Sequence, residues 1–309
     1  MFPYIERPIY DKFMVNQGTL YLSLLVATFA VSWAAVLIKL ADAPPLPIAF
    51  YRMGMAALIL AIPALPKMRQ TFRILTRKQI GLLVLSGVVL GLHFAFWVTS
   101  LFYTTISNST ILVATQPIFI LVMEAAILKD KIPVRSVVGM VVAIIGMAVI
   151  SRGDLHLGKE YIIGDILALI GAFCAGTYLF IGRQLRARID NLGYILPVYA
   201  ISALTLLIIS LAYGENMTDY PARSWIIFLL LAIIPTVLGH SLYNWLLKYV
   251  PAHMVATTIL GEPIGATILA IFFFNQIPGW WTVVGGALIL SGIFVVLSRG
   301  KEKMAVIAE

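Results

Sequence analysis

The sequence predicts an all-α integral membrane protein whose ten transmembrane helices form two inverted five-helix repeats. Three observations predict this fold: a very apolar composition, ten successive long apolar segments, and residues that recur at matching positions in both halves. The chain has 309 residues, of which 61% are hydrophobic and 12% are charged, and its mean hydropathy is +0.97. That charged fraction is about half that of an ordinary soluble domain. Such a composition excludes a soluble enzyme, a disordered chain and a nucleic-acid-binding domain.

Ten apolar segments are long enough to cross a bilayer, which takes about 20 residues as a helix. Most are apolar on every face, as lipid-embedded helices are, and they are too long for the strands of a membrane β-barrel. The first segment is too long for a signal peptide and lacks a small-residue cleavage site, so it is interpreted as a span. The longest connection is the basic stretch 67–78. The predicted spans lie near 18–39, 47–66, 79–101, 105–128, 134–151, 162–185, 192–213, 224–247, 252–274 and 279–298.

The distribution of Lys and Arg predicts the orientation of these spans, because cytoplasmic loops are enriched in both. With the N-terminus inside, 17 of the 22 basic residues fall in inner segments and 3 in outer loops. We therefore expect a multi-pass protein of the cell membrane with both termini in the cytoplasm. The expected parts are a cytoplasmic tail 1–17, repeat 1 over 18–151, an extracytoplasmic linker 152–161, repeat 2 over 162–299 and a cytoplasmic tail 300–309.

The internal repeat rests on matched spacings in the two halves. Trp97 precedes Ile111 by 14 residues, and Trp245 precedes Ile259 by the same distance. Each half holds five spans, an odd number, so the second half must enter the membrane upside down. This inverted arrangement is typical of secondary transporters. Three further pairs are separated by 146 residues: Pro117 and Pro263, Gly139 and Gly285, and Gly146 and Gly292.

Several short motifs carry a resemblance to a known family. They are Phe50-Tyr51-Arg52, Gln116-Pro117, Tyr243-Asn244-Trp245 and Gly261-Glu262-Pro263. With them, residues 18–299 resemble the EamA-type ten-helix members of the drug/metabolite transporter (DMT) superfamily. The resemblance implies a central cavity lined by spans 1–4 and 6–9, with spans 5 and 10 as peripheral supports. It also implies transport of small solutes such as amino acids, nucleotide-related metabolites or drugs, without fixing which.

Glu262 is the strongest single candidate for a functional residue. It lies ten residues into the ninth predicted span, near the bilayer middle, where a carboxylate costs at least about 2.5 kcal/mol to insert. It should therefore be partnered, protonated or in contact with water. Gly261 and Pro263 flank it, and Pro117 follows Gln116 at the matching place in the fourth span. Proline-interrupted segments at corresponding places in two repeats predict a transport site. The alternative is a structural kink in which Glu262 bonds to a neighbouring helix.

Other polar and aromatic residues inside the spans are weaker candidates for substrate binding or coupling. His93 and His240 either hydrogen-bond across helices or line a wet path. Interior aromatic residues either fill packing space or line an amphipathic cavity. Arg52 either reaches the interface or pairs with Asp42, or it binds a carboxylate of the substrate. The remaining candidates are Trp33, Trp97, Tyr178, Tyr199, Asn244 and Trp245.

The sequence favours a secondary transporter of small organic metabolites or drugs, with export of amino-acid-like solutes as the leading hypothesis. Transport would proceed by alternating access around a midplane cavity, with Glu262 binding either a proton or the ammonium group of the substrate. The expected partners are a small-molecule substrate, the lipid bilayer and protons as coupling ion, with no nucleic acid, and the oligomeric state stays open. No cofactor and no metal site are expected, because Cys174 is the only cysteine and no other His lies at ligand spacing from the candidate pair.

Two rival functions belong to other classes. An enzyme acting on lipid would need catalytic His, Asp or Ser residues clustered at one interface, whereas the polar residues here are spread along the spans and paired between the repeats. A channel would favour rings of like residues in an oligomer and has no need of an inverted repeat. No nucleotide-hydrolysing motif is present, which excludes primary active transport by this chain alone. We therefore do not expect an enzyme.

Overall fold

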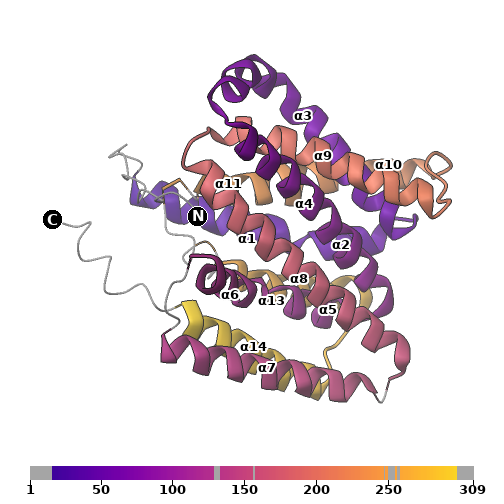
Figure 1. Cartoon of the computed structure of the whole chain (residues 1–309). Coiled ribbons are helices and arrows are strands. Elements are labelled where there is room, and N and C mark those ends of the chain that lie inside the picture. Colours follow the sequence, from indigo (N-terminus) through magenta and orange to yellow (C-terminus); the bar gives the residue numbers. More distant parts are fainter. Residues whose placement is uncertain are drawn as a thin grey trace.

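The computed structural model describes residues 16–128, 133–155, 157–246, 248–249, 255 and 258–297. The predicted tails 1–17 and 300–309 lie outside this part except for residues 16 and 17. Every regular element in these ranges is helical (Figure 1). The helices are α1 (Gln17–Ser32), α2 (Ala34–Leu40), α3 (Pro45–Ile74), α4 (Arg77–Tyr103), α5 (Ile106–Val113), α6 (Gln116–Leu128), α7 (Val134–Leu155), α8 (Lys159–Arg186), α9 (Asn191–Ala212), α10 (Ala222–Leu231), the π-helix η1 (Ala232–His240), α11 (Ser241–Leu246), α13 (Gly261–Phe274) and α14 (Trp280–Leu297).

The ten predicted spans are all present as apolar helical segments. Eight of them are long and apolar enough to cross a membrane, and α13 and α14 are shorter apolar helices at the last two predicted places. The prediction of an all-helical, ten-span membrane protein is therefore confirmed. Four spans are interrupted in the described residues: the first changes from α1 to α2 at Trp33, the fourth from α5 to α6 at 114–115, the eighth contains η1, and the ninth has a turn at Leu260 before α13.

Two connections are shorter than predicted. The basic stretch 67–78 is not a loop, because α3 continues to Ile74. Its last turns are held against α9 by an ion pair of 3.3 Å between Lys67 and Asp190. The expected linker 152–161 is also mostly helical, since α7 ends at 155 and α8 begins at 159. Gly158, directly before α8, has a φ of 132°, which residues with a side chain rarely adopt.

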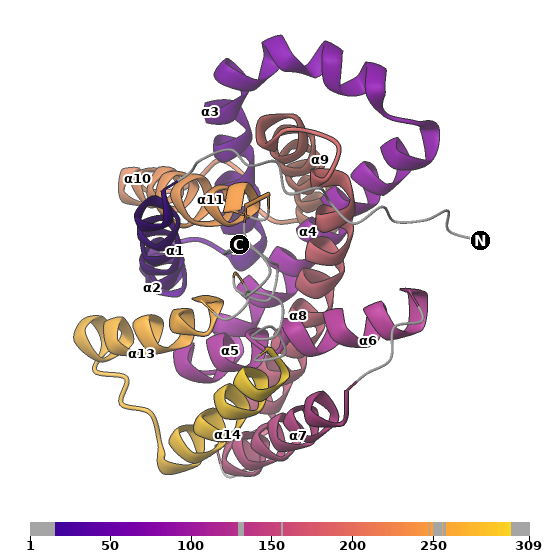
Figure 2. The same cartoon turned by 90° about the vertical axis from the view of Figure 1, so that its left-hand side faces the viewer.

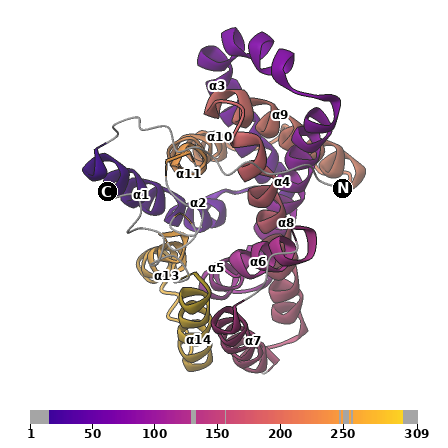
Figure 3. The same ribbon diagram turned by 60° about the vertical axis from the view of Figure 1, so that its left-hand side comes forward.

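Helices α7 and α14 form one edge of the bundle and lie side by side in all three views (Figures 1, 2 and 3). Their backbones meet at four glycines in a reciprocal pattern. A Cβ atom on Gly139 would lie 2.5 Å from the carbonyl oxygen of Gly292, and one on Gly292 would lie 2.5 Å from that of Gly139. Gly146 and Gly285 face each other in the same way at 2.6 and 2.7 Å. The contacts run antiparallel, as a two-fold axis perpendicular to the helices would produce.

The rest of the bundle repeats the same pairing between halves. Helix α3 packs along α9 at the edge opposite to α7 and α14 (Figure 2). Helix α4 packs along α8, and at the related place α1 packs along η1. Gly87 and Gly91 of α4 allow the close approach of α9, and Gly261 and Gly265 face Thr28 and Ser32 of α1. These two pairs of small residues therefore allow close packing between helices of the same chain.

Candidate functional site

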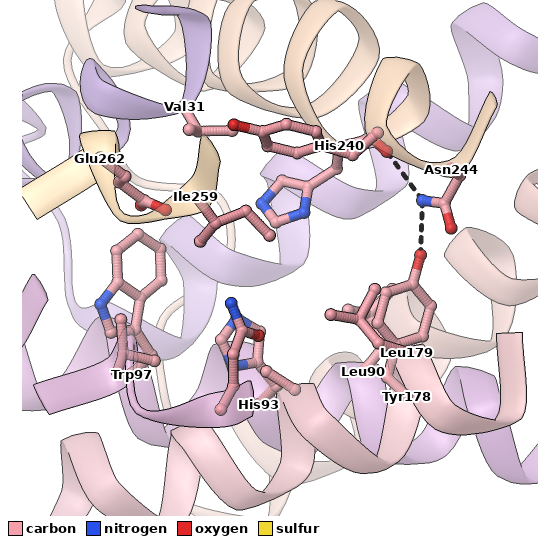
Figure 4. Close-up of a pocket in the computed structure, with 14 residues that line it drawn as sticks. Val31, Leu90, His93, Trp97, Tyr178, Leu179, His240, Asn244, Ile259 and Glu262 are labelled. Atoms are coloured by element: carbon pink, nitrogen blue, oxygen red, sulfur yellow. Dashed lines mark hydrogen bonds between the residues drawn. The ribbon is translucent and has the colours of Figure 1, made fainter. Parts of the chain in front are cut away.

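A cavity lies in the middle of the bundle, between helices of both halves (Figure 4). About 590 Å³ of its space, including the part that opens outward, is free of protein atoms. Six predicted site residues line it together: His93, Trp97, Gln116, Tyr178, His240 and Asn244. Glu262 is the seventh predicted site residue at this cavity. The other lining residues are Val31, Leu90, Val113, Ala175, Leu179, Tyr243 and Ile259.

Gln116 and Glu262 reach the cavity from the first turns of two half-helices. Helix α5 ends at 113, and α6 begins at Gln116 with Pro117 in its first turn. Helix α13 begins at Gly261, with Pro263 in its first turn. Proline is tolerated there because the first backbone N–H groups of a helix have no partner within the helix. The sequence predicted an interruption of the ninth span at Pro263, and the structure places Glu262 in the first turn of the half-helix that follows the interruption.

The start of a helix carries a partial positive charge, which favours a nearby carboxylate or an anionic ligand. No side chain caps the N-terminus of α13. Among the described residues, none hydrogen-bonds to the carboxylate of Glu262, and its side chain is only half-buried because the cavity leaves one side open. The alternative in which Glu262 hydrogen-bonds to a neighbouring helix is therefore not seen among the described residues. Its carboxylate faces space that a ligand or water can occupy.

His240 enters the cavity at the end of the π-helix η1. Nine residues, 232–240, follow this wider winding, with Pro235 inside it. Proline cannot donate a backbone hydrogen bond, and π-helical turns occur often at functional sites. The hydroxyl of Thr236 donates to the carbonyl of Leu231 over 2.8 Å and accepts from Nε of Arg52 over 2.8 Å. The irregular winding is thus joined to α3 by one hydrogen bond.

Aromatic rings form the wall of the cavity on the α4 side. The rings of His93 and Trp97 stack with centroids 5.9 Å apart and planes inclined by 4°. The Nδ1 atom of His93 lies 2.9 Å from the carbonyl oxygen of Gly171 on α8, which fixes the ring between the two helices. Phe94 packs edge-on against His240, with centroids 5.7 Å apart. The indole nitrogen of Trp97 is buried without a partner among the described residues.

A chain of polar contacts closes the cavity at the side of α8 and α11. The amide nitrogen of Asn244 donates to the hydroxyl of Tyr178 and to the carbonyl of His240, each over 2.7 Å (Figure 4). The backbone carbonyl of Asn244 accepts from Nε of the buried Arg186 over 3.2 Å. The ring of Tyr178 stacks on that of Tyr194, whose hydroxyl lies 2.8 Å from the hydroxyl of Ser86. These contacts join α8, α9 and α11 below the cavity.

Four predicted site residues do not line the cavity. Trp33 packs against Phe273 of α13 with ring centroids 5.7 Å apart. Trp245 packs against Tyr249 with centroids 4.6 Å apart. Tyr199 and Arg52 lie one layer behind the wall, on α9 and α3. The family resemblance implied that spans 2 and 7 line the cavity, but none of the described lining residues comes from them, because α4 and η1 stand in between.

The structure corrects the predicted ion pair of Arg52. Arg52 neither reaches the interface nor pairs with Asp42, since its side chain is fully buried whereas Asp42 is exposed. Glu124 pairs with Arg183 of α8 at 2.5 Å. Lys129 and Lys131, the basic residues that follow Glu124 in the sequence, lie outside the described residues.

Tyr243 is the main cavity residue that sequence reasoning missed. It lies 146 residues after Trp97, the separation that also relates the matched prolines and glycines. The match between the two tryptophans uses a separation of 148 and leads instead to Trp245. Two residues correspond to a rotation of about 200° around a helix, so the two matches indicate opposite faces. The separation of the prolines therefore gives the correct face.

The described residues offer no cluster of three or more His, Cys, Asp or Glu side chains that could hold a metal ion. Two histidines and one carboxylate line the cavity at separate places, and Cys174 is buried in α8. The site is thus an apolar and aromatic cavity with a few hydrogen-bonding groups and one carboxylate. This combination is typical of a site that binds small organic molecules.

Comparison with known proteins agrees with this geometry. The profile of the EamA-like transporter family matches residues 16–152 and again residues 162–298, which together make up most of the chain. The chain belongs to this family. A member of the EamA-like transporter family is a multi-pass membrane protein, and its two matched segments correspond to the two five-helix halves. The family assigned from the sequence is therefore confirmed.

Three relatives that are named as transporters or exporters match this chain over 90% or more of both chains. An uncharacterized transporter of Archaeoglobus fulgidus is 25% identical over 93% of this chain and 99% of its own. The pseudopaline exporter CntI of Pseudomonas aeruginosa is 26% identical over 94% and 98%. A probable terminal-alkyne amino-acid exporter of Streptantibioticus cattleyicolor is 23% identical over 90% and 92%. A solved crystal structure shares the fold with a TM-score of 0.64 and 17% identity, over 91% of this chain and 96% of that one.

Proposed function

We propose that this EamA-like transporter exports small amino-acid-like solutes by alternating access around the central cavity. The observation that carries the proposal is the position of Glu262, at the start of a half-helix in a cavity enclosed by both halves. The reciprocal glycine contacts of α7 and α14 support a rocking motion of the two halves about a fixed site. A lipid-cleaving enzyme would need a cluster of catalytic residues at one interface, and the polar residues gathered here lie mid-bundle.

The chemistry of the cavity wall supports the substrate class. Rings of His93, Trp97 and Tyr178 offer apolar surface with polar edges, which suits an organic side chain. Two of the relatives are named as exporters, one of pseudopaline and one of an amino acid. Glu262 supplies a negative charge that an ammonium group can meet. An amino-acid-like solute satisfies all three features.

Glu262 has two possible roles in this transport. If it binds a proton on one side of the membrane and releases it on the other, the proton gradient drives accumulation. If it binds the ammonium group of the solute, it contributes to affinity directly, by a charge-assisted hydrogen bond worth about 1.5–3 kcal/mol. Glu262→Gln keeps the shape of the side chain and removes its charge, and it separates the two roles.

The experiment uses the purified chain in proteoliposomes. A thermal-shift screen against amino acids, nucleosides, polyamines and common drugs first identifies a solute, since a ligand raises the melting temperature with its concentration. Uptake driven by a pH gradient and counterflow without a gradient are then measured for the wild type and Glu262→Gln. In the proton role, the variant loses driven uptake and keeps counterflow. In the ammonium role, it loses both, together with the thermal shift.

Two results would contradict the proposal. A Glu262→Gln variant that drives and exchanges solute like the wild type would show that Glu262 has no part in transport. Flux that rises without saturation and shows no counterflow would identify a channel instead of a carrier. Melting curves on the same preparations serve as the control, because a purely structural Glu262 would lower the melting temperature without altering either activity selectively.

We also infer that both termini lie in the cytoplasm, on the evidence of the 17 inner against 3 outer basic residues. In a Cys174→Ala background, a cysteine at Arg77 should be labelled from the inside and one at Asp219 from the outside. Both positions are exposed: Arg77 is the first residue of α4, and Asp219 lies between α9 and α10. Labelling of the two from the opposite sides would reverse the assigned orientation.

A further inference from the structure

Arg52 is a buried cation whose bonding capacity is largely unused. Its side chain is 0% exposed, and its Nε atom donates to Thr236. Its two terminal nitrogens are buried and have no hydrogen-bond partner among the described residues. A charge removed from water is stable only when it is paired and hydrogen-bonded, so these two nitrogens lack a partner that the guanidinium requires.

One of the two aromatic rings that Arg52 contacts, that of Trp97, lines the cavity. The guanidinium carbon lies 4.3 Å from the ring centroid of Phe94 and 5.8 Å from that of Trp97. Such cation–π contacts stabilise the charge only in part, because they do not replace hydrogen bonds. Phe94 packs against His240, which lines the cavity as Trp97 does. One layer of aromatic side chains therefore separates the cation from the space that a solute can enter.

We propose that Arg52 is a carboxylate-binding residue of the transport cavity, reached when Phe94 and Trp97 move aside during the transport cycle. Three properties favour a carboxylate. The terminal nitrogens are the two donors that a bidentate pair with a carboxylate uses. Nε is already held by Thr236, which fixes the orientation of the fork. One guanidinium neutralises one carboxylate, whereas a phosphate dianion would need a second cation.

The second charge of the site supports the same ligand. Arg52 and Glu262 interact electrostatically, yet no ion pair joins them. A solute with an ammonium group and a carboxylate would give each of the two a partner of opposite charge and leave the loaded cavity neutral. This inference rests on the proposed transport function and adds to it the group that recognises the acid end of the solute.

The test compares binding of three charge forms of each common amino acid: the free zwitterion, its cationic amide and its anionic N-acetyl derivative. Thermal shifts of the purified full chain give the apparent Kd of each form for the wild type and for Arg52→Gln. The wild type should prefer the free amino acid to its amide. Arg52→Gln should weaken binding of the free amino acid by about 10- to 100-fold and that of the amide by less than about twofold, which abolishes the preference.

Two further variants keep the test decisive. Lys39→Gln removes a cation whose ammonium lies over the ring of Phe102, 5.2 Å from its centroid, and not at the cavity, so its binding profile should match the wild type. Arg52→Lys keeps the charge without the fork and should retain part of the preference for the free acid. It also serves if Arg52→Gln does not fold.

Specific results would overturn the proposal. Equal loss of amino acid and amide binding in Arg52→Gln would show that Arg52 only supports the wall. Equal binding of amino acid and amide by the wild type would show that no carboxylate is recognised. If no charge form binds but a nucleoside or polyamine is transported, the role of Arg52 is wrong while transport stands. If no solute is bound or moved at all, the proposed function itself fails.

Discussion

Two regions of the molecule pair a segment of one repeat with the matching segment of the other. These regions are the contact between α7 and α14 and the starts of the half-helices α6 and α13, and they differ in whether the matching positions carry the same residue. At the first, the related positions carry the same residue, and Gly139 and Gly146 meet Gly292 and Gly285. At the second, the related positions differ, with Gln116 on α6 and Glu262 on α13. The packing contact is symmetric, and the cavity is not.

The difference follows from what each region contacts. At the contact between α7 and α14, each backbone occupies the space that a side chain on the other helix would need. Because a two-fold axis relates the two helices, both must carry glycine at the matching positions. A small organic solute has no such symmetry, so the two halves of a cavity can offer it different groups. The asymmetric positions of an inverted repeat therefore indicate where a ligand binds, and the symmetric ones indicate where the halves hold together.

The largest expected effect comes from breaking the symmetric contact. Gly139→Leu would place a side chain against the carbonyl of Gly292, and a backbone atom cannot give way as a side chain can. We expect a loss of about 3 kcal/mol in the free energy of unfolding, seen as a lower melting temperature in detergent. Gly81→Leu on α4 is the matched control, because a Cβ there meets nothing within 4 Å. Equal melting temperatures for the two variants would refute the close contact.

The next effect concerns the asymmetric pair. Glu262→Gln should lower transport by about tenfold or more, because a charge-assisted interaction with the solute or proton is lost. Gln116→Leu removes only a neutral hydrogen-bonding group from the related position and should lower transport by about two- to fivefold. Initial rates in proteoliposomes at one solute concentration measure both. A larger effect at Gln116 than at Glu262 would show that the charged half of the pair is not the functional one.

The smallest expected effect, on stability, concerns Tyr243, which makes a hydrogen bond that its counterpart Trp97 lacks. The hydroxyl of Tyr243 lies 2.7 Å from that of Thr28 on α1, whereas the indole nitrogen of Trp97 has no partner among the described residues. Tyr243→Phe should therefore lower the free energy of unfolding by about 1 kcal/mol. Tyr21→Phe, at an exposed ring of α1, is the control and should change nothing. An unchanged melting temperature for Tyr243→Phe would mean that this hydrogen bond adds no stability.

Much of the cavity could be predicted from single residues. Glu262 and Gln116 are polar, lie deep in apolar segments and precede prolines at matching places, and each of these properties can be read along the chain. His93, Trp97, Tyr178, His240 and Asn244 were predicted as polar or aromatic interruptions of their spans, and the structure brings all of them to the same cavity. Their part in binding or coupling remains a prediction.

Arg52 shows where such reasoning fails. Its place near the end of a predicted span favoured an interfacial side chain, yet the structure buries it completely against Phe94 and Thr236. Burial depends on how α3 packs against α4 and η1, and no local property of the residue encodes that packing. The π-helix that carries Thr236 could not be predicted from the sequence either. Pro235 predicts only that the regular backbone hydrogen bonding is interrupted, not that the helix winds more widely.

The sequence by itself determined the number of spans, the inverted relation of the halves and the two proline breaks, because hydropathy and spacing are properties of the chain taken in order. Only the tertiary structure decided which face of each span meets the cavity. Tyr243 and Trp245 are two residues apart, yet one lines the cavity and the other packs against Tyr249. Helix rotation makes that choice, since each residue turns the side chain by about 100°, and the packing of neighbouring helices sets the rotation.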